Sequence, residues 1–297
     1  MNYKIIVWGI GAIYNKHLNI LKYYEHKNEI EIVGITATDI PKVRTIDGYQ
    51  VVSLNELTFL KYDYLLIMND LHYFDIQKKA IIIGVDEKKL LHYKFLELPN
   101  LVFADYIKLK KDRLSIISNN CWGGTIYNTL GLECLSPFKN LFLKDDSYLR
   151  MLNNLEYYLN CEPVFMKWAV DPHSRNSYPV LRLDDVYIHC NHDMIPETAI
   201  GNWNRRRKKI NMNNLFIEMY TDNIETAKDF KQLNKYEHKI CFVPFASNEK
   251  FLYYLKLFHG QSEFWEAVIS SARNGKNSIS YNIVDLLSGK VVHRLET

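Results

Sequence analysis

Apolar residues recur along the chain in two alternating patterns, short runs and helix-spaced stretches. In the first hundred residues, the runs at 4–7, 29–36 and 64–68 have the length and composition of strands. The stretches at 13–23 and 73–83 carry apolar residues at helical spacing. Because strands that alternate with helices pair in parallel through right-handed crossovers, the pattern predicts an α/β fold with a parallel sheet.

The alternation continues beyond a charged segment, 108–113, that contains no glycine or proline. We therefore predict a Rossmann-like nucleotide-binding domain at 1–112 and a second, different α/β domain at 113–297. Asp145 and Asp146 suit the start of an amphipathic helix in the second domain. Further strands are expected at 164–170, 215–220 and 239–243, and a further helix at 196–210.

A glycine turn follows the first expected strand. Gly9 and Gly11 open the next helix, and Asp39 follows the second strand, where dinucleotide folds place the acid that holds a ribose hydroxyl. Tyr14 replaces the third glycine of that fingerprint, which argues against NAD. We predict that these four residues bind a nucleotide or nucleotide sugar, with Tyr14 stacking on a ring or holding the helix off the strand. The alternative is a turn without a ligand.

The stretch 115–127 passes from an apolar run through a polar loop to two glycines that open a helix. A helix N-terminus attracts anions and lowers the pKa of a nearby thiol, so Cys121 is a candidate nucleophile and the glycine N–H groups could hold an oxyanion. The alternative is a small buried residue beside a turn. Asn119 and Asn120 are candidate contacts for sugar hydroxyls, and ordinary turn chemistry is their alternative.

Paired acids and two histidines follow in the second domain. Because the pKa of histidine lies near neutrality, His189 is a candidate general base that Asp184 or Asp185 would orient. We predict a catalytic group of Cys121, His189 and Asp185, and we expect Asn119, Cys121, His189 and Arg207 to converge in one cleft. A hydrogen-bonded histidine at a strand end is the alternative. No metal site is predicted, because the strand-like run before His189 does not place both histidines on one helix face.

A basic run, 205–209, lies near the end of the helix expected at 196–210. At about 100° per residue, Trp203 faces the core, Arg206 and Arg207 border that face, and the other three basic residues point outward. We predict that Arg206 and Arg207 hold an anionic ligand, or that one of them pairs with a buried aspartate at 184 or 185. A solvated helix face is the alternative.

These motifs resemble a bacterial family of unknown function that is associated with exopolysaccharide and capsule synthesis. The resemblance spans about 113–250 and includes Ser118–Gly124, Tyr178–Pro179, Asp184–Asp185, His189 with His192, Trp203 with Arg205–Arg207, and Ile210–Asn211. It implies an α/β fold in surface-carbohydrate assembly, with Trp122, His192 and Trp203 as further substrate contacts. Asp193 stands where the resemblance leads us to expect an aromatic residue. The first 110 residues resemble the Rossmann-like domains that precede bacterial sugar acetyltransferases.

Composition argues against several classes of function. A net charge of +3 does not indicate nucleic-acid binding, and the five scattered cysteines suggest neither disulfides nor a cysteine-based zinc site. The N-terminal apolar run is interrupted by glycine, so we expect neither a signal peptide nor a membrane span, and a cytoplasmic location. Twenty-one tyrosines and five tryptophans favour ligand pockets that are partly exposed to water, because these side chains are apolar with one polar group.

Together, these features predict a transferase of exopolysaccharide or capsule synthesis. Its cofactor is unknown, with a nucleotide-activated sugar or an acyl donor favoured over NAD. The expected partner is a small-molecule nucleotide sugar or a saccharide, and the pattern leaves room for a homo-oligomer. The alternative is a non-catalytic module that binds or presents a nucleotide sugar.

Overall fold

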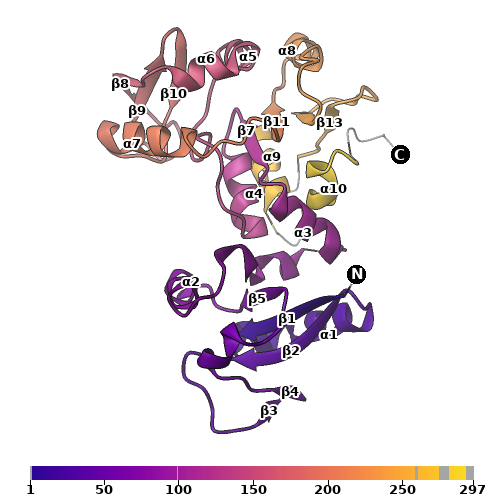
Figure 1. Ribbon diagram of the computed structural model, residues 1–297. Coiled ribbons are helices and arrows are strands. Elements are labelled where there is room, and N and C mark those ends of the chain that lie inside the picture. The colour runs from indigo at the N-terminus through magenta and orange to yellow at the C-terminus, as the bar shows by residue number, and fades with distance from the viewer. Residues whose placement is uncertain (1, 99, 258–259, 274–280, 292–297) are drawn as a thin grey trace. The chain divides into compact units, whose positions relative to one another are not determined.

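The computed structural model describes residues 2–98, 100–257, 260–273 and 281–291, and the chain divides into two compact units (Figure 1). Unit 1 comprises Met1–Lys108 and Leu130–Leu132, and unit 2 comprises Leu109–Thr129 and Glu133–Thr297. Each unit contains a four-stranded parallel sheet and helices, so the predicted α/β class is confirmed. The boundary expected after residue 112 remains a prediction.

The sheet of unit 1 has the strand order β2-β1-β5-β6. Its elements are β1 (Tyr3–Trp8), α1 (Ala12–His26), β2 (Ile30–Thr36), the small hairpin β3 (Thr45–Ile46) and β4 (Tyr49–Gln50), η1 (Leu54–Thr58), β5 (Tyr64–Ile67), α2 (Tyr73–Ile82), η2 (Glu87–Lys89), β6 (Leu90–His92) and η3 (Tyr93–Glu97). The order reverses at β1, which has β2 on one side and β5 on the other. Open parallel sheets bind ligands at such a switch point.

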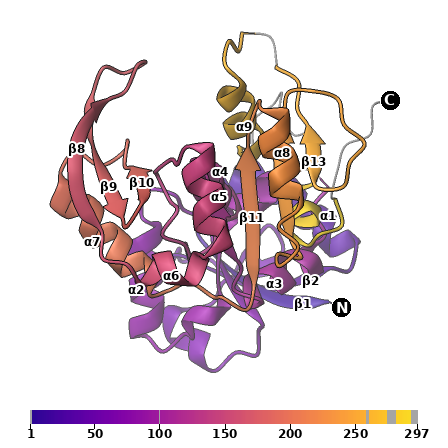
Figure 2. The same ribbon diagram turned by 90° about the horizontal axis from the view of Figure 1, so that it is seen from above.

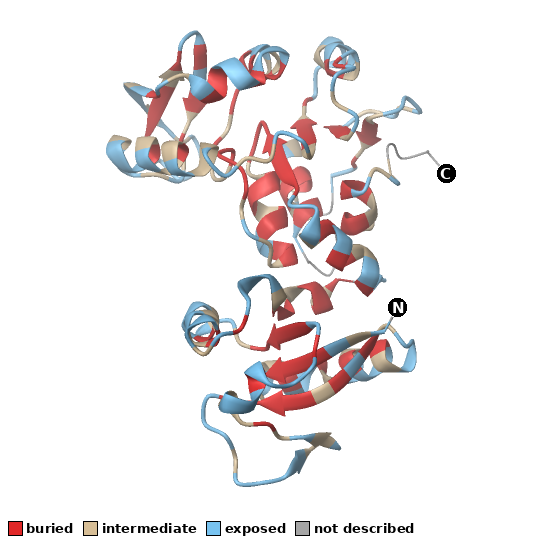
Figure 3. Cartoon of the chain, viewed as in Figure 1, coloured by how far each residue is buried: buried red, intermediate tan, exposed pale blue. Residues whose placement is uncertain are grey.

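Buried strands form the centre of unit 1. Every residue of β5 is buried, as expected for a parallel strand that is covered on both faces (Figure 3). Ile76 and Ala80 of α2 pack into one core with Trp8 and Leu65. Gly84 follows α2 with φ of +99°, a left-handed conformation that glycine adopts freely at helix ends.

The sheet of unit 2 has the order β13-β12-β11-β7, and all its neighbouring strands are parallel. Its strands are β7 (Ser115–Ser118), β11 (Leu215–Tyr220), β12 (Lys239–Val243) and β13 (Leu252–Tyr254), and its helices include α4 (Trp122–Leu130), α5 (Asp145–Asn153), α8 (Ile224–Lys231), α9 (Phe264–Ala272) and α10 (Ile283–Leu287). The helix α3 (Phe103–Lys111) spans the division between the units.

Two different cores cover the faces of this sheet. On one face, α5 and α8 lie beside β11 (Figure 2), and Tyr148 and Phe230 pack against Ile217. On the other face, Trp122 of α4 stacks on Phe216 and contacts Phe242. Side chains therefore alternate along β11 between the two cores. The residues at the end of β11 lie at the C-terminal edge of the sheet.

An antiparallel sheet, β10-β9-β8, is inserted between β7 and β11. It comprises β8 (Val164–Val170), β9 (Ser177–Leu183) and β10 (Val186–His189), and α6 (Leu155–Asn160) and α7 (Pro196–Arg207) flank it in the sequence. The strands at 164–170, 215–220 and 239–243 have the expected bounds. The helix expected at 196–210 is shorter, because its last turn ends at Arg207.

Within the described part of the chain, no helix is at once long enough and apolar enough to cross a bilayer.

Candidate functional site

The C-terminal edge of the unit 2 sheet is built by side-chain amides. Ser118 and Glu218 are the last residue pair between β7 and β11. Beyond them, Asn119 replaces the backbone ladder: its Nδ2 donates to the carbonyl of Tyr220 at 3.0 Å, and its Oδ1 accepts from the N–H of Tyr220 at 3.1 Å. The chain can therefore turn away from the sheet without leaving Tyr220 unpaired.

Glu218 is a buried acid directly beneath this edge. It has no exposed surface, and both of its carboxyl oxygens lie 3.0 Å from the donating Nδ2 of Asn120. Burial raises the pKa of Glu218 to about 8, so the side chain carries a proton at neutral pH. Sequence reasoning did not single out Glu218, although an acid inside an otherwise apolar strand is the signal that could have found it.

The first N–H groups of α4 are already paired. Asn120 Oδ1 accepts from the N–H of Trp122 at 2.7 Å, and Ser118 Oγ accepts from the N–H of Gly123 at 3.1 Å. The expected use of the glycine N–H groups for an oxyanion is therefore wrong for Gly123. Glycine is needed here for another reason, because a methyl group would lie 2.6 Å from Ser118 Oγ.

Cys121 has a different histidine partner from the one expected. Its Sγ lies 3.3 Å from Nε2 of His192, and burial raises the pKa of the thiol to about 11. His189 instead stacks on Phe142, with ring centroids 4.4 Å apart, and its Nδ1 lies 3.2 Å from the hydroxyl of Tyr178. Burial lowers the pKa of His189 to about 4. A nucleophilic role for Cys121 stays a prediction, but its partner is His192.

Asp185 does not orient His189. It lies in the tight turn between β9 and β10, where it accepts from Arg150 at 2.9 Å and from the Tyr158 hydroxyl at 2.7 Å. The bond from Tyr158 is the main reason that the pKa of Asp185 is lowered. Along an extended strand, four residues separate it from His189 by roughly 13 Å. The expected pairing is wrong because the hairpin places acid and base at opposite ends of one strand.

The two expected tryptophan contacts belong to the core. Trp122 has no exposed surface, and its Nε1 donates to the hydroxyl of Tyr281 at 3.0 Å. Trp203 is 2% exposed and packs edge-on against Phe138. Their predicted roles as substrate contacts are wrong, because a buried ring that closes the core cannot also face a ligand.

Arg206 and Arg207 are partly buried, whereas Arg205, Lys208 and Lys209 are exposed, as the helical spacing predicts. Arg207 donates to the carbonyls of Leu159 and Cys161 at 2.9 and 2.7 Å and pairs with Glu162. It therefore stabilises the C-terminal end of α6, and the expected pairing with an aspartate at 184 or 185 is wrong.

Arg206 donates to the carbonyl of Lys139 at 2.9 Å. Both guanidinium groups thus have protein partners, and their use as an anion site stays a prediction. Arg207 does not join Asn119, Cys121 and His189 in one cleft, because its partners all come from the end of α6 and the residues that follow it.

A cavity of about 310 Å³ opens at the same sheet edge. It is lined by Asn119, Phe142, Leu143, Lys144, Asp145, Tyr220, Thr221, Asp222, Glu263, Phe264 and Trp265. The rings of Tyr220 and Phe264 contact each other edge-on, with centroids 5.9 Å apart. The cavity therefore combines aromatic walls with three carboxylates, an ammonium group and an amide. Of these residues, the sequence singled out only Asn119 for binding.

Asp145 is the half-buried acid of this cavity. Its Oδ2 accepts from Thr221 Oγ1 at 2.5 Å, and burial is the main cause that raises its pKa. Sequence reasoning assigned Asp145 only to the start of α5, which is also where it lies. Its position in the cavity wall depends on the hydrogen bond from Thr221, which is distant in sequence.

In unit 1, the glycine turn lies at the switch point of the sheet. Gly9 has φ of +121°, and a methyl group there would lie 3.0 Å from the carbonyl oxygen of Met68. The space beside Gly11 is open, as a ligand site at the start of α1 would require. Asp39 is exposed at the end of the second strand. These positions agree with nucleotide binding, which stays a prediction.

Of the two roles expected for Tyr14, stacking on a ring does not fit the structure, and holding the helix off the strand stays a prediction. Its ring has no exposed surface, and its hydroxyl donates to Oδ2 of Asp47 at 2.9 Å. Stacking on a nucleotide is therefore wrong for Tyr14, because its apolar ring is part of the core. The other charged groups at this edge form the pair of Lys94 with Asp70, at 3.1 Å.

Among the residues that the structure describes, no three side chains of His, Cys, Asp or Glu gather in an arrangement that could hold a metal ion.

Comparisons with known proteins match both parts of the chain. Residues 1–91 match the C2185-like N-terminal domain, and residues 92–288 match the domain of unknown function DUF1919. An uncharacterised protein of Haemophilus influenzae is 32% identical over 173 residues, which cover 57% of this chain and 81% of that protein. The links to sugar acetyltransferases and to polysaccharide synthesis stay predictions. The match over residues 92–288 shows that the chain belongs to the DUF1919 family.

Proposed function

We propose that unit 2 binds a saccharide in the sheet-edge cavity and that the chain is a cytoplasmic transferase of exopolysaccharide or capsule assembly. The observation that carries this proposal is the composition of the cavity wall. Tyr220, Phe264 and Trp265 offer apolar ring faces, and Asp222 and Lys144 offer hydrogen-bonding groups beside them. Sugars present both C–H faces and hydroxyls, so they fit a pocket with aromatic rings and a few polar groups.

The donor is proposed to be a nucleotide-activated sugar or an acyl donor. The glycine turn at the unit 1 switch point supports nucleotide binding, because backbone N–H groups at a helix start suit phosphate. In unit 2, the cavity has three carboxylates against the one ammonium group of Lys144, so it suits the uncharged sugar part of such a donor rather than its phosphates.

Asp145 is the candidate base for transfer to a saccharide hydroxyl. In such a step, the acceptor oxygen attacks the activated carbon, its proton passes to the carboxylate of Asp145, and the activating group departs with the bonding electrons. A raised pKa favours this role, because it makes the carboxylate a better proton acceptor than an exposed aspartate. The hydroxyl of Thr221 holds the acid in place.

A non-catalytic binding module is the second candidate, and the state of Cys121 favours it. The thiol is protonated at neutral pH, and Trp122 and Gly123 donate their N–H groups within the protein. A covalent transfer through Cys121 would need an activated thiolate and free donors for an oxyanion. A binding module keeps the cavity and needs neither.

A ligand screen tests the proposal. Thermal shifts with UDP-, CDP- and GDP-sugars, acetyl-CoA and NAD identify a ligand, and calorimetry and product analysis follow. We expect Trp265→Ala to weaken binding about tenfold or more, because Trp265 lines the cavity. The matched control is Trp168→Ala, which removes an exposed tryptophan of β8 outside the cavity lining.

Each outcome of the screen has a defined meaning. A bound sugar that is turned over supports the transferase, and a bound sugar without a product supports the binding module. If no sugar compound binds, or if Trp168→Ala weakens binding as much as Trp265→Ala does, the cavity is not a saccharide site.

A further inference from the structure

The most exposed apolar side chains of the chain's described part gather around one helix of unit 1. Phe59, Leu71, Ile82 and Phe74 are 85%, 85%, 83% and 71% exposed, and each exceeds every other large apolar side chain described. Phe74 and Ile82 belong to α2, and Leu71 lies just before it. Phe59 follows Thr58, whose Cγ2 would lie 3.3 Å from a methyl group at Gly84, just past the end of α2. A monomer rarely exposes such a cluster without a binding function.

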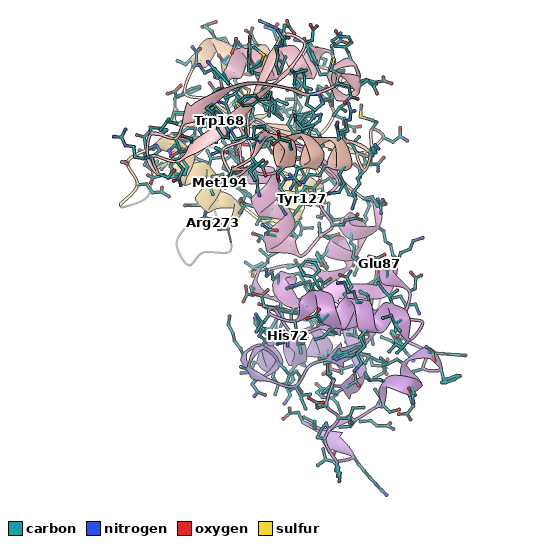
Figure 4. All side chains as sticks on the ribbon, turned by 90° about the vertical axis from the view of Figure 1, so that its left-hand side faces the viewer. His72, Glu87, Tyr127, Trp168, Met194 and Arg273 are labelled. Atoms are coloured by element: carbon teal, nitrogen blue, oxygen red, sulfur yellow. The ribbon has the colours of Figure 1, made fainter. Side chains whose placement is uncertain are left out.

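The helix presents these residues away from its own core. At about 100° per residue, Phe74 and Ile82 lie opposite Ile76 and Ala80, which are buried against the sheet. Ile81 is 42% exposed and borders the same outer face. In Figure 4, α2 faces the viewer, and His72 at its start is labelled. The helix is therefore apolar on two sides, and its inner side is already covered.

We infer that this outer face of α2, which comprises Phe59, Leu71, Phe74, Ile81 and Ile82, binds the same face of a second copy of the chain. The two helices run antiparallel around a twofold axis. A self-complementary surface of this kind closes into a dimer, because each patch is covered by its copy. The apolar side chains that water now surrounds would lie between the two helices.

The charges along α2 favour a second copy over other occupants. Asp75 lies in the first turn, and Lys78 and Lys79 lie in the second half. An antiparallel copy brings the acidic start of each helix beside the basic end of the other, and it also opposes the helix dipoles favourably. The aliphatic stem of Lys78 can lie along the apolar face while its ammonium group reaches the rim. An anionic membrane would not match Asp75 in this way.

Sedimentation velocity on the full chain tests the inference. The wild-type protein is expected at twice 35.1 kDa, and Phe74→Glu combined with Ile82→Glu is expected at 35.1 kDa with an unchanged melting temperature. Met194→Glu is the matched control, because Met194 is 68% exposed in unit 2 and lies far from α2 in sequence.

Charge reversal tests the antiparallel arrangement. Asp75→Lys is expected to raise the dimer dissociation constant at least about tenfold, and Asp75→Lys with Lys79→Asp is expected to restore it, because the reversed ends again face opposite charges. A wild-type protein that stays monomeric at every concentration overturns the inference. So does a dimer that survives both glutamate substitutions, or one that only Met194→Glu disrupts.

Discussion

The two parallel sheets of this chain end in different chemistry at equivalent edges. In unit 1, β1 is followed by a glycine turn with open space beside Gly11, and the residues after β5 and β6 form the surface pair of Asp70 with Lys94. In unit 2, β7 is followed by two asparagines that bond to each other, to Glu218 and to the backbone of Tyr220. The start of α1 thus has no side-chain cap, whereas the asparagine amides of unit 2 bond within the protein.

The two edges differ in the groups that they could offer to a ligand. The unit 1 edge suits a phosphate, because the start of α1 has no side-chain cap. At the unit 2 edge, the network around Glu218 holds the positions of Asn119 and Tyr220, and both line the cavity. Under the proposed function, a ligand there would contact the rings and carboxylates of the cavity wall rather than free backbone groups.

The largest expected effect is the loss of Glu218. At about pH 5, Glu218→Ala should lower the free energy of unfolding by about 4 kcal/mol, because it leaves a cavity and removes the partner of the buried amide of Asn120. The unit 1 counterpart, Asp70→Ala, removes an exposed pair with Lys94 and should cost less than about 1 kcal/mol. Urea unfolding measures both. Equal costs would mean that the two edges do not differ in this way.

The second prediction concerns the pH dependence of stability. The pKa of Glu218 is raised from 4.5 to about 8 in the folded protein, so the folded state binds more protons between these values and stability falls as pH rises through them. Glu218→Gln has no such group. Its stability relative to the wild type should therefore grow by roughly 4 kcal/mol across the window, since the other titrating groups are common to both proteins. A constant difference would contradict a protonated Glu218.

The third prediction compares the two glycines of unit 1. Gly9→Ala should cost about 2 kcal/mol, because the left-handed conformation and the nearby carbonyl of Met68 both oppose a side chain. Gly11→Ala should change stability by less than about 0.5 kcal/mol, since the space there is open. Thermal unfolding measures both. If Gly11→Ala nevertheless abolishes nucleotide binding, the ligand occupies the open space beside Gly11. If Gly11→Ala binds a nucleotide as tightly as the wild type does, there is no nucleotide site beside Gly11.

The smallest expected effect is on the reactivity of Cys121. Because burial raises the pKa of the thiol to about 11, alkylation by iodoacetamide should be slow at neutral pH and rise steadily toward that value. Peptide mass spectrometry resolves Cys121 from the other cysteines. A rate that is already at its plateau near neutrality would show an activated thiolate beside His192 and would revive a nucleophilic mechanism.

Sequence reasoning located the elements well where the pattern is local. The strands at 164–170 and 215–220 follow from short apolar runs, and the end of α2 follows from Gly84. The contrast between partly buried Arg207 and exposed Lys208 follows from helical spacing alone. In each case, the deciding residues lie within a few positions of one another.

The site was harder to predict because its partners are distant in sequence. Asn120 and Glu218 are 98 residues apart, and Asp145 and Thr221 are 76 residues apart. The choice between His189 and His192 as the partner of Cys121 depends on the path of the loop after β10, which no local pattern fixes. Trp122 was misplaced because a ring with a polar N–H suits both a pocket and a core whose Tyr281 accepts from it.

Fluorine NMR on protein labelled with fluorotryptophan tests the central claim, saccharide binding at the unit 2 edge, most directly. Trp265 lines the cavity, Trp8 lies beside Gly9 at the unit 1 edge, and Trp168 is an exposed control on β8. Tryptophan-to-phenylalanine variants assign the resonances. On titration with nucleotide sugars, the Trp265 resonance should shift saturably. The nucleotide alone should shift the Trp8 resonance, and no compound should shift the Trp168 resonance. If no saccharide compound shifts the Trp265 resonance, the cavity does not bind a saccharide.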